Sequence, residues 1–255
     1  MMIWTKRFIA IALVLAVWSV CSKAGVVNDY LLPAPWKVVA IALKMLREGT
    51  LSTHLRTSLL RVFFGFGIAF GLAFPLAMLI GFNRICLELL ETPLEFIRHI
   101  PPLATTPLLI LWLGIGEASK LAVIVLASFF PVFLNTVSGL THCDKKLVEV
   151  GEVLGLDRFE RIVYIILPSA LPVIIVGIRL GFGYAWRALI GAELLAATAG
   201  LGYMIIEAEE LARPDIVLVG ILAIGSMGHL LDVLFLRLSR HLVPWKGIEA
   251  TLDRS

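Results

Sequence analysis

The sequence predicts an all-α integral membrane protein with about six transmembrane helices, and composition carries most of that prediction. Apolar residues make up 59% of the 255 residues and charged residues make up 16%, whereas soluble domains have about 45–50% and about 25%. The mean hydropathy is +0.94. Several uncharged runs approach the roughly 20 residues that a helix needs to cross the hydrocarbon core. We therefore expect one transmembrane domain over residues 1–255, with its core at residues 55–240.

The charged and sulfur-containing residues exclude several other classes of protein. The net charge is only +3, and no basic stripe with interleaved aromatic residues suggests a nucleic acid partner. Cys21, Cys86 and Cys143 are too few and too scattered for a disulfide framework or a metal site. The five histidines show no ligand spacing, and no set of nucleophile, base and acid is visible. We expect no nucleic acid partner, no catalytic residue, no metal and no cofactor.

The first apolar run, Phe8–Ser22, follows Lys6 and Arg7. A cleavable signal peptide has the same layout, but residues 21–25 do not form a small-x-small cleavage site. The sequence therefore favours a retained anchor. The five later spans are expected at Val62–Asn83, His99–Gly116, Leu121–Cys143, a run that opens with Ile162–Ile178, and a run that opens with Ile216–Leu231 and ends in Asp232 and then Arg237 and Arg240. A count of five or seven stays open, because a re-entrant piece within the fifth run would change the number of spans.

Glycines and prolines shape these spans. Small residues let helices approach closely in lipid, and the second span has four glycines: Gly65, Gly67, Gly71 and Gly81. Pro75 is expected to kink this span, and Pro131 lies inside the fourth. Pro101, Pro102 and Pro107 should break or bend the start of the third span.

Lys and Arg in the loops predict the orientation. With the N-terminus inside, the cytoplasmic side receives twelve of them: Lys6, Arg7, Arg84, Arg98, Lys145, Lys146, Arg158, Arg161, Arg237, Arg240, Lys246 and Arg254. The outer side receives eight: Lys23, Lys37, Lys44, Arg47, Arg56, Arg61, Lys120 and Arg213. This bias favours both termini inside. Residues 35–47 read as an amphipathic helix along the outer interface, with one apolar face formed by Val38, Ile41, Ala42 and Met45.

The loop at residues 141–170 is predicted to be an ordered cytoplasmic bracket. Its first helix carries an apolar stripe at i, i+3, i+4 and i+7, formed by Leu147, Val150, Gly151 and Leu154. Gly155 suits the left-handed turn that ends a helix. Asp157 and Glu160 have the spacing of a reciprocal cap for a second helix, which Pro168 should end or bend.

A plain connector between helices usually takes about 2–8 residues, whereas this loop spends many more on ordered structure. An exposed apolar stripe flanked by acidic residues is typical of a docking surface. The loop therefore predicts a partner protein on the cytoplasmic side.

Three short runs in this loop resemble a family motif. Glu149-Val150-Gly151, then Gly155, then Ile166-Leu167-Pro168 resemble the EAA motif of ABC importer permeases. The usual alanines are replaced at Val150 and Gly151, and a glycine costs a helix up to about 1 kcal/mol. The resemblance implies a type I, MetI-like permease fold that couples to a separate ABC ATPase subunit. By position, its ATPase-coupling residues are Glu149, Val150, Gly151, Leu154, Gly155, Leu156 and Asp157.

Four further stretches make the resemblance more specific, to a subgroup of these permeases. Trp186-Arg187, Ala192–Leu195, Gly200–Met204 and Leu242–Trp245 resemble permeases for nitrate, sulfonates, taurine and related compounds. That resemblance implies a multi-pass protein of the bacterial cytoplasmic (inner) membrane, a permease homodimer, and an extracytoplasmic solute-binding protein. It also implies the import of a small solute such as an anion.

Several ionisable residues lie in or near the predicted spans: Arg179, Arg187, Glu193, His229 and Asp232. Such groups usually face a bundle interior or a water-filled path. In one interpretation Arg187 and Glu193 line the translocation pathway, and Arg187 attracts an anion. In the other, which we favour, these charges form structural pairs or reach the interface on long stems.

The sequence lacks G-x-x-x-x-G-K-[ST], the phosphate-binding loop of ATP hydrolysis. We therefore expect a transport subunit, not an enzyme, with ATP hydrolysis in a partner chain. The main alternative is a secondary transporter driven by an ion gradient, which usually has two similar halves with broken helices in matching places. No such pairing is visible. A membrane enzyme or signalling scaffold has still less support.

Overall fold

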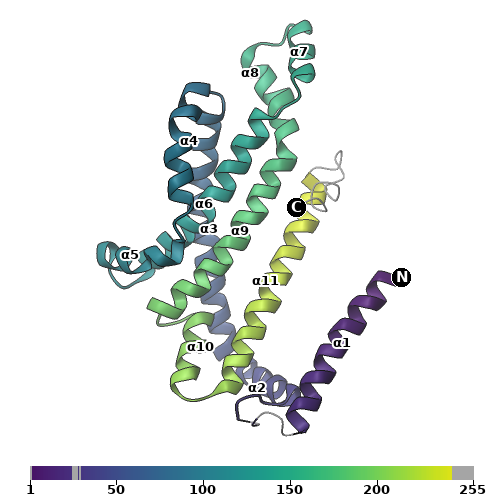
Figure 1. Ribbon diagram of the computed structural model, residues 1–255, viewed down its shortest axis with the longest axis vertical. Helices are drawn as coiled ribbons and strands as arrows, with labels where there is room; N and C mark the ends of the chain where they lie inside the picture. The colour runs from purple at the N-terminus through teal and green to yellow at the C-terminus, as the bar shows by residue number, and fades with distance from the viewer. Residues whose placement is uncertain (1, 25–27, 29, 243–255) are drawn as a thin grey trace. The chain divides into compact units, whose positions relative to one another are not determined.

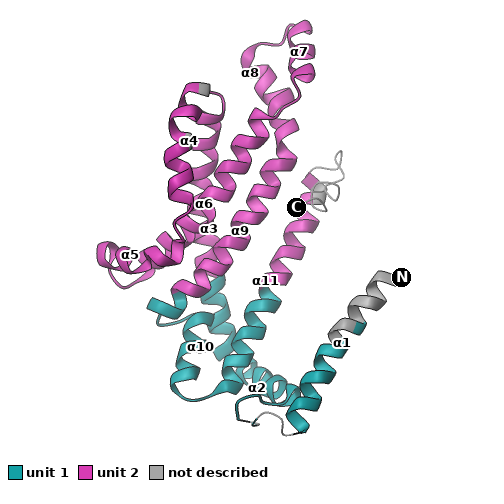
Figure 2. Cartoon of the chain, viewed as in Figure 1, with its two compact units in different colours: residues 1–59, 193–227 teal, residues 60–192, 228–255 magenta. Residues whose placement is uncertain are grey.

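The computed structural model describes residues 2–24, 28 and 30–242, and these residues contain helices and loops without a strand. The chain divides into two compact units (Figure 2). Unit 1 comprises residues 1–59 and 193–227, and unit 2 comprises residues 60–192 and 228–255.

The elements follow one another in chain order as shown in Figure 1. They are α1 (Met2–Lys23), α2 (Pro35–Arg47), α3 (Thr50–Gly81), α4 (Arg84–Arg98), a 3-10 turn η1 (Pro102–Thr105), α5 (Thr106–Leu113), α6 (Glu117–Thr141), α7 (Lys145–Val153), α8 (Arg158–Arg161), a π-helical turn η2 (Ile162–Ile166), α9 (Leu167–Ala196), α10 (Leu201–Glu210) and α11 (Pro214–Leu242).

Among the described residues, four helices are long and apolar enough to cross a membrane, at Thr50–Gly81, Glu117–Thr141, Arg158–Ala196 and Pro214–Ser239. A fifth span results if the bent pair Thr92–Arg98 and Pro102–Leu113 crosses as one. The apolar helical stretch of α1, Ala12–Lys23, is shorter than the four candidate spans. The all-helical membrane fold is confirmed at this coarser level of four to five candidate spans.

The third predicted span is not one straight helix. The chain bends by 83° between the two halves of the pair, and α5 has only eight residues, or about 12 Å at 1.5 Å per residue. Pro101 and Pro102 interrupt the helical hydrogen bonds at the bend. Helix α4 was not predicted, because the charged residues of this segment leave no long apolar run. This helix is strongly amphipathic and is capped by Asn83, whose side chain accepts from the N–H groups of Ile85 and Cys86.

Pro168 was predicted to end or bend the second helix of the bracket. Pro168 does not end the second helix of the bracket, since the chain stays helical from Arg158 to Ala196. The π-helical turn at Ile162–Ile166 precedes Pro168, and its wider winding accommodates a residue that lacks an N–H group. The last candidate span continues past Asp232 and ends at Ser239, between the predicted terminal charges Arg237 and Arg240. Asp232 is accommodated within α11 because its carboxylate pairs with Arg179 of α9.

The core of unit 2 is a seam in which α6 packs against α3 and α9 (Figure 1). Against α3, Val132 and Phe133 meet Ala73 and Ala77. Against α9, Leu140 meets Ala170 and Ile174. Small residues on both sides allow the dense packing that membrane helices need, because burial from lipid gives little hydrophobic gain.

Two glycines of α9 permit its closest approach to α6. A Cβ on Gly177 would lie 2.5 Å from Asn135 Cβ and 3.0 Å from the Pro131 carbonyl oxygen. A Cβ on Gly181 would lie 2.7 Å from Val132 Cγ2 and 3.1 Å from the Ser128 carbonyl oxygen. Any side chain at these positions would push the two backbones apart.

The four glycines of α3 divide into two pairs. Gly65 packs on Ile124 and Gly81 packs on Leu140, as predicted for close helix approach. Gly67 and Gly71 have no atom within 4 Å of a built Cβ. Only two of the four therefore serve helix packing within the described chain.

Unit 1 contains the predicted amphipathic helix with the expected bounds, α2. Val38 and Met45 of its apolar face are buried, while Ile41 and Ala42 are partly exposed. The indole N–H of Trp18 on α1 donates to the Pro33 carbonyl oxygen at 3.2 Å. The hydroxyl of Tyr30 donates to the Ala212 carbonyl oxygen at 2.7 Å, which joins this segment to the loop after α10.

We predict that Gly177→Ala lowers the free energy of unfolding by about 1–3 kcal/mol, because overpacking forces the α6 and α9 backbones apart. The matched control is Gly183→Ala on the same helix, where a built Cβ meets no atom within 4 Å. This control should be neutral or gain up to about 1 kcal/mol from helix propensity. Thermal unfolding of the purified variants in detergent measures both. Equal stability of the two variants would contradict a tight seam at Gly177.

Candidate functional site

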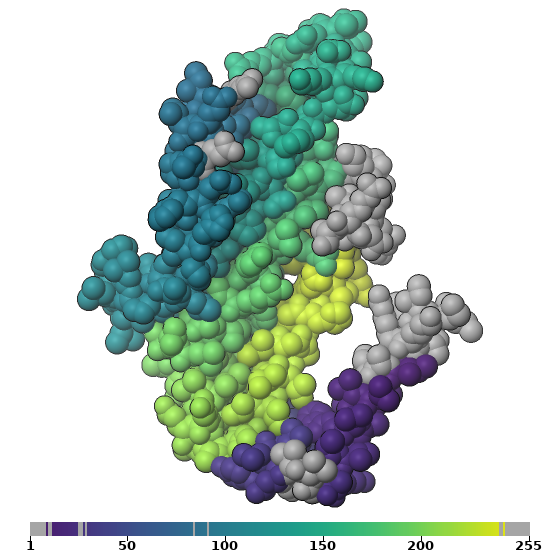
Figure 3. Space-filling model, viewed as in Figure 1, coloured from purple at the N-terminus to yellow at the C-terminus, as the bar shows by residue number. Residues whose placement is uncertain are grey.

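The bracket consists of α7, α8 and the turn between them, and it lies beyond the ends of α6 and α9 (Figures 1 and 3). Its first helix begins at Asp144, whose side chain accepts from the N–H of Lys146 at 3.0 Å. This N-cap satisfies one of the N–H groups that the first turn of a helix leaves unpaired.

The predicted left-handed turn at Gly155 is confirmed, with φ +76°. The N–H of Gly155 donates to the Glu152 carbonyl and the N–H of Leu156 donates to the Gly151 carbonyl, both at 3.0 Å. These two bonds form a Schellman motif, which satisfies the last carbonyls of α7. A residue with a Cβ would be strained at this φ, so Gly155 fixes the sharp turn.

The predicted cap of the second helix is also confirmed. The N–H of Glu160 donates to Asp157 Oδ1 at 2.7 Å, and the N–H of Asp157 donates to Glu160 Oε2 at 2.9 Å. Together they make a complete capping box. An ion pair between Arg161 and Glu152 then ties α8 to α7.

Gly151 lies inside the bracket. It is buried, and a Cβ built on it would come 2.5 Å from Ile165 Cδ1 and 3.3 Å from Arg161 Cγ. The glycine therefore lets α7 lie directly on the chain that leads into α9. The predicted apolar stripe is divided as a result, since Gly151 faces inward and its neighbours face solvent.

The outer surface of the bracket is strongly apolar. Its most exposed apolar side chains are Val153 (88%), Leu154 (72%) and Phe159 (72%), followed by Val150 (53%) and Leu147 (47%). Large apolar side chains gathered on an ordered loop mark an interaction surface. We call this set the docking face.

Three members of the docking face, Leu147, Val153 and Phe159, were not among the predicted coupling residues, although Leu147 belongs to the predicted apolar stripe. Val153 lies off the i, i+3, i+4 stripe, so helical periodicity alone excluded it. Of the predicted set, Glu149, Val150, Leu154, Gly155 and Asp157 are exposed, and Leu156 is partly buried.

A buried carboxylate organises unit 1. Glu193, at the end of α9, is 1% exposed. The Ser58 hydroxyl lies 2.9 and 2.8 Å from its two carboxylate oxygens, and the N–H of Gly202 donates to Oε2 at 3.0 Å. The N–H of Leu201 donates to Ser58 Oγ at 2.9 Å. Glu193 and Ser58 thus cap the N-terminus of α10, where the helix dipole favours negative charge.

Gly200 makes this arrangement possible. Its φ is +125°, and a Cβ built on it would collide with the Glu193 carboxylate. Its N–H donates to His54 Nδ1 at 3.1 Å, so that nitrogen is an acceptor. The runs Ala192–Leu195 and Gly200–Met204 are therefore two halves of one structural feature.

One turn further along α10, the Tyr203 hydroxyl donates to Glu207 Oε1 at 3.1 Å. This bond to a carboxylate raises the pKa of Tyr203 above its ordinary value.

The charges within the spans are largely paired, in line with the structural interpretation. Arg179 on α9 makes a bidentate ion pair with Asp232 on α11, at 2.7 and 2.8 Å. Arg187 and Glu193 do not meet: Arg187 is exposed, with its guanidinium 5.7 Å from the centre of the Tyr184 ring, while Glu193 is buried. Within the described chain, no group of three or more His, Cys, Asp or Glu residues could hold a metal ion.

An all-helical membrane domain with an ordered, apolar-faced bracket between two spans has the architecture of a transport subunit driven by a separate protein. The protein-family profile described as "binding-protein-dependent transport system inner membrane component" matches residues 73–244. The chain belongs to this family.

Curated relatives cover most of the chain. It is 38% identical to the putative aliphatic sulfonates transport permease protein SsuC of Bacillus subtilis, over 96% of this chain and 88% of the relative. It is 35% identical to the taurine transport system permease protein TauC of Escherichia coli, over 93% and 88%. It is 30% identical to the nitrate import permease protein NrtB of a Synechocystis strain, over 92% and 88%.

The family establishes the general role. The chain is a multi-pass inner-membrane permease subunit of an ABC importer and is not itself catalytic. Such a binding-protein-dependent system has an ATPase partner and a solute-binding partner. Of the stretches that carried the narrower resemblance, residues 243–245 lie outside the described residues, as do Lys246 and Arg254.

We predict that Glu193→Gln lowers the free energy of unfolding by about 1–3 kcal/mol, because a buried charged acceptor is replaced by an amide that donates towards Ser58. Glu210→Gln on the exposed end of α10 is the matched control and should change stability by less than about 0.5 kcal/mol. Thermal unfolding in detergent checks both. If the two variants unfolded alike, the cap on α10 would carry no stability.

Proposed function

We propose that this permease imports a small oxyanion of the sulfonate or nitrate type. Three relatives are named as permeases for aliphatic sulfonates, taurine and nitrate, and these names support the proposed solute class. These solutes share an anionic group whose several oxygens accept hydrogen bonds. Cations near the transport path would favour such an ion, because a charge acts more strongly where little water screens it.

The docking face is the observation that carries the proposed coupling to the ATPase. Of the predicted coupling residues, Val150 and Leu154 belong to it and the other five lie beside it in the chain. The Schellman turn and the capping box hold it rigid. A rigid bracket transmits a displacement of the ATPase to α6 and α9, whereas a flexible loop would absorb it. ATP binding and hydrolysis would then switch the helices between inward-facing and outward-facing states.

We also propose a homodimer of six-span subunits with both termini inside. Large apolar side chains are exposed along α3, α9 and α11, including Phe64, Leu79, Leu180 and Leu234, and a second subunit or lipid would cover them. Two of the eight cations first assigned to the outer side, Arg61 and Lys120, are buried and pair with Glu117. Their role is structural, and Arg98 lines a cleft at the middle of two spans rather than a loop, so the bias becomes eleven to six and favours the proposed orientation more strongly.

We expect Leu154→Glu to weaken binding of the partner ATPase at least about tenfold, because a charge replaces an apolar anchor at the centre of the interface. Leu211→Glu is the matched control, since Leu211 is 67% exposed but lies in the loop after α10. Co-purification of the ATPase with each tagged variant measures the effect. Normal ATPase recovery with Leu154→Glu, or equal loss with Leu211→Glu, would rule out docking through the bracket.

A transport assay tests the solute class. Cells that carry the permease, its ATPase and its solute-binding protein should take up labelled ethanesulfonate, taurine or nitrate, and deletion of the permease should abolish that uptake. A neutral sugar or a cationic amino acid serves as the control solute. Uptake of none of the three would refute the proposed solute class.

A further inference from the structure

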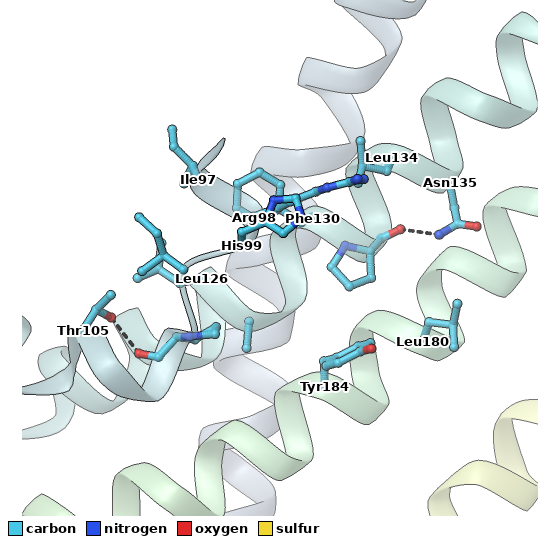
Figure 4. A pocket seen from close by; sticks show the side chains of 14 residues that line it. Ile97, Arg98, His99, Thr105, Leu126, Phe130, Leu134, Asn135, Leu180 and Tyr184 are labelled. Atoms are coloured by element: carbon cyan, nitrogen blue, oxygen red, sulfur yellow. Dashed lines mark hydrogen bonds between the residues drawn. The ribbon is translucent and has the colours of Figure 1, made fainter. Parts of the chain in front are cut away.

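Unit 2 contains a cleft of about 520 Å³ between the end of α4, the bend that follows it, α6 and α9 (Figure 4). This volume lies within the usual range of small-molecule sites, about 300–1,000 Å³. Most of its lining is apolar, for example Leu126 and Phe130. The polar groups are few: Arg98, His99, Thr105, Asn135 and Tyr184.

The cleft lies half-way along two spans. Its α6 residues fall between 126 and 135 of a helix that runs from 117 to 141, and its α9 residues are Leu180 and Tyr184. At the same place the bent pair changes direction by 83°. A non-helical backbone at membrane depth is tolerated where it is buried in protein or lines a cavity. Broken helices at this depth often mark solute sites in transporters.

Arg98 is the cationic group of the cleft. Its Nη2 contacts Glu95 Oε1 at 3.1 Å on the same helix, and its side chain is 39% exposed. A guanidinium has five N–H donors in a planar fork, so this single contact leaves donors for a ligand. The fork matches the oxygens of a bound oxyanion, and such charge-assisted bonds are the strong ones.

The other polar groups have defined roles around Arg98. His99 Nδ1 faces the Glu95 carbonyl oxygen, which can only accept, so Nδ1 carries a proton. Asn135 Nδ2 donates to the Pro131 carbonyl oxygen at 2.8 Å. Tyr184 presents its phenol to the cleft, and Arg187 lies over its ring. Arg187 therefore adds positive potential beside the cleft without lining it.

A second cleft, of about 350 Å³, continues from the first. The two share Arg98 and Leu134. The second follows α4 and α6 past Ser138 to Thr141 and His142, where α6 ends before the bracket, and its lining includes the carboxylates of Glu88 and Glu95. The two clefts together extend from the middle of the spans to the end that carries the docking face, with Arg98 at their junction.

We propose that Arg98 and the larger cleft form a binding station for a small organic oxyanion. The guanidinium holds the anionic group, and the apolar lining accepts a short aliphatic tail. This inference rests on the proposed import of an oxyanion, but it identifies Arg98 rather than Arg187 as the residue that contacts the solute. Arg98 would thus be a specificity-determining residue of the permease.

The first test compares Arg98→Gln and Arg98→Lys with Arg237→Gln, an exposed arginine of α11 outside both clefts. In cells with the complete transporter, Arg98→Gln should raise the KM for ethanesulfonate uptake at least about tenfold, because a charge-assisted bond is lost. Arg98→Lys should retain part of the uptake, and Arg237→Gln should behave as wild type. Co-purification of the ATPase should be normal for all three. Assembled Arg98→Gln with a wild-type KM would overturn the inference.

The second test does not depend on Arg98→Gln being active. In membrane vesicles with the full transporter, Asn135→Cys is labelled with 2-sulfonatoethyl methanethiosulfonate. Peptide mass spectrometry measures the extent of labelling at residue 135 separately from the other cysteines. Ethanesulfonate should slow this labelling at least about threefold, whereas it should not protect Ser226→Cys on α11, which is exposed and outside the cleft. Lack of protection at a transported concentration would overturn the inference.

The two proposals fail in different ways. If the wild-type transporter took up none of ethanesulfonate, taurine and nitrate, the proposed solute class would fail first. If the wild type took up one of them while Arg98→Gln kept the same KM and residue 135 stayed unprotected, only the binding station at Arg98 would fail. A tenfold KM change together with protection of residue 135 would support both.

Discussion

The close approach of α6 and α9 is the constraint on which the rest of unit 2 depends. Gly177 and Gly181 bring α9 onto the backbone of α6 at Pro131 and Ser128, so the two helices behave as one rigid pair. The bracket is the chain segment that joins these same two helices at one end. The cleft with Arg98 is lined by their middle portions. A loose seam would separate the bracket, where we propose that the ATPase acts, from the cleft, where we propose that a solute binds.

This arrangement gives a physical basis for coupling. The bracket resists deformation because each of its turns is closed by specific bonds: the Schellman pair at Gly155, the capping box at Asp157 and Glu160, and the Arg161–Glu152 ion pair. Gly151 lets α7 lie against the start of the long helix at Ile165. A push on the docking face therefore reaches α9 through packed atoms rather than through a flexible linker. Transmission of this kind needs two alternative arrangements of a packed element, not a continuous deformation.

The ionisable residues of the spans serve different purposes according to their surroundings. Arg179 and Asp232 neutralise each other between α9 and α11, and the Glu193 carboxylate accepts hydrogen bonds from hydroxyl and backbone donors at the start of α10. Buried charges without such partners would be costly. Arg98 and Arg187 are exposed instead, and they lie at or beside the larger cleft. Their exposure is what makes them available to an anion.

The sequence by itself determined the membrane fold, the bracket and the family, because each depends on local information. Apolar content and run length place most spans, and the bracket follows from a stripe, a glycine and a cap that lie within a few residues of one another. The EAA-like spacing then identified the partner ATPase. Only the tertiary structure decided that Gly151 faces inward, that Glu193 caps α10 rather than lining a path, and that Arg98 stands in a cleft. These facts depend on residues distant in sequence, such as Ser58 with Glu193 and Arg98 with Tyr184, whose proximity arises only when the helices pack.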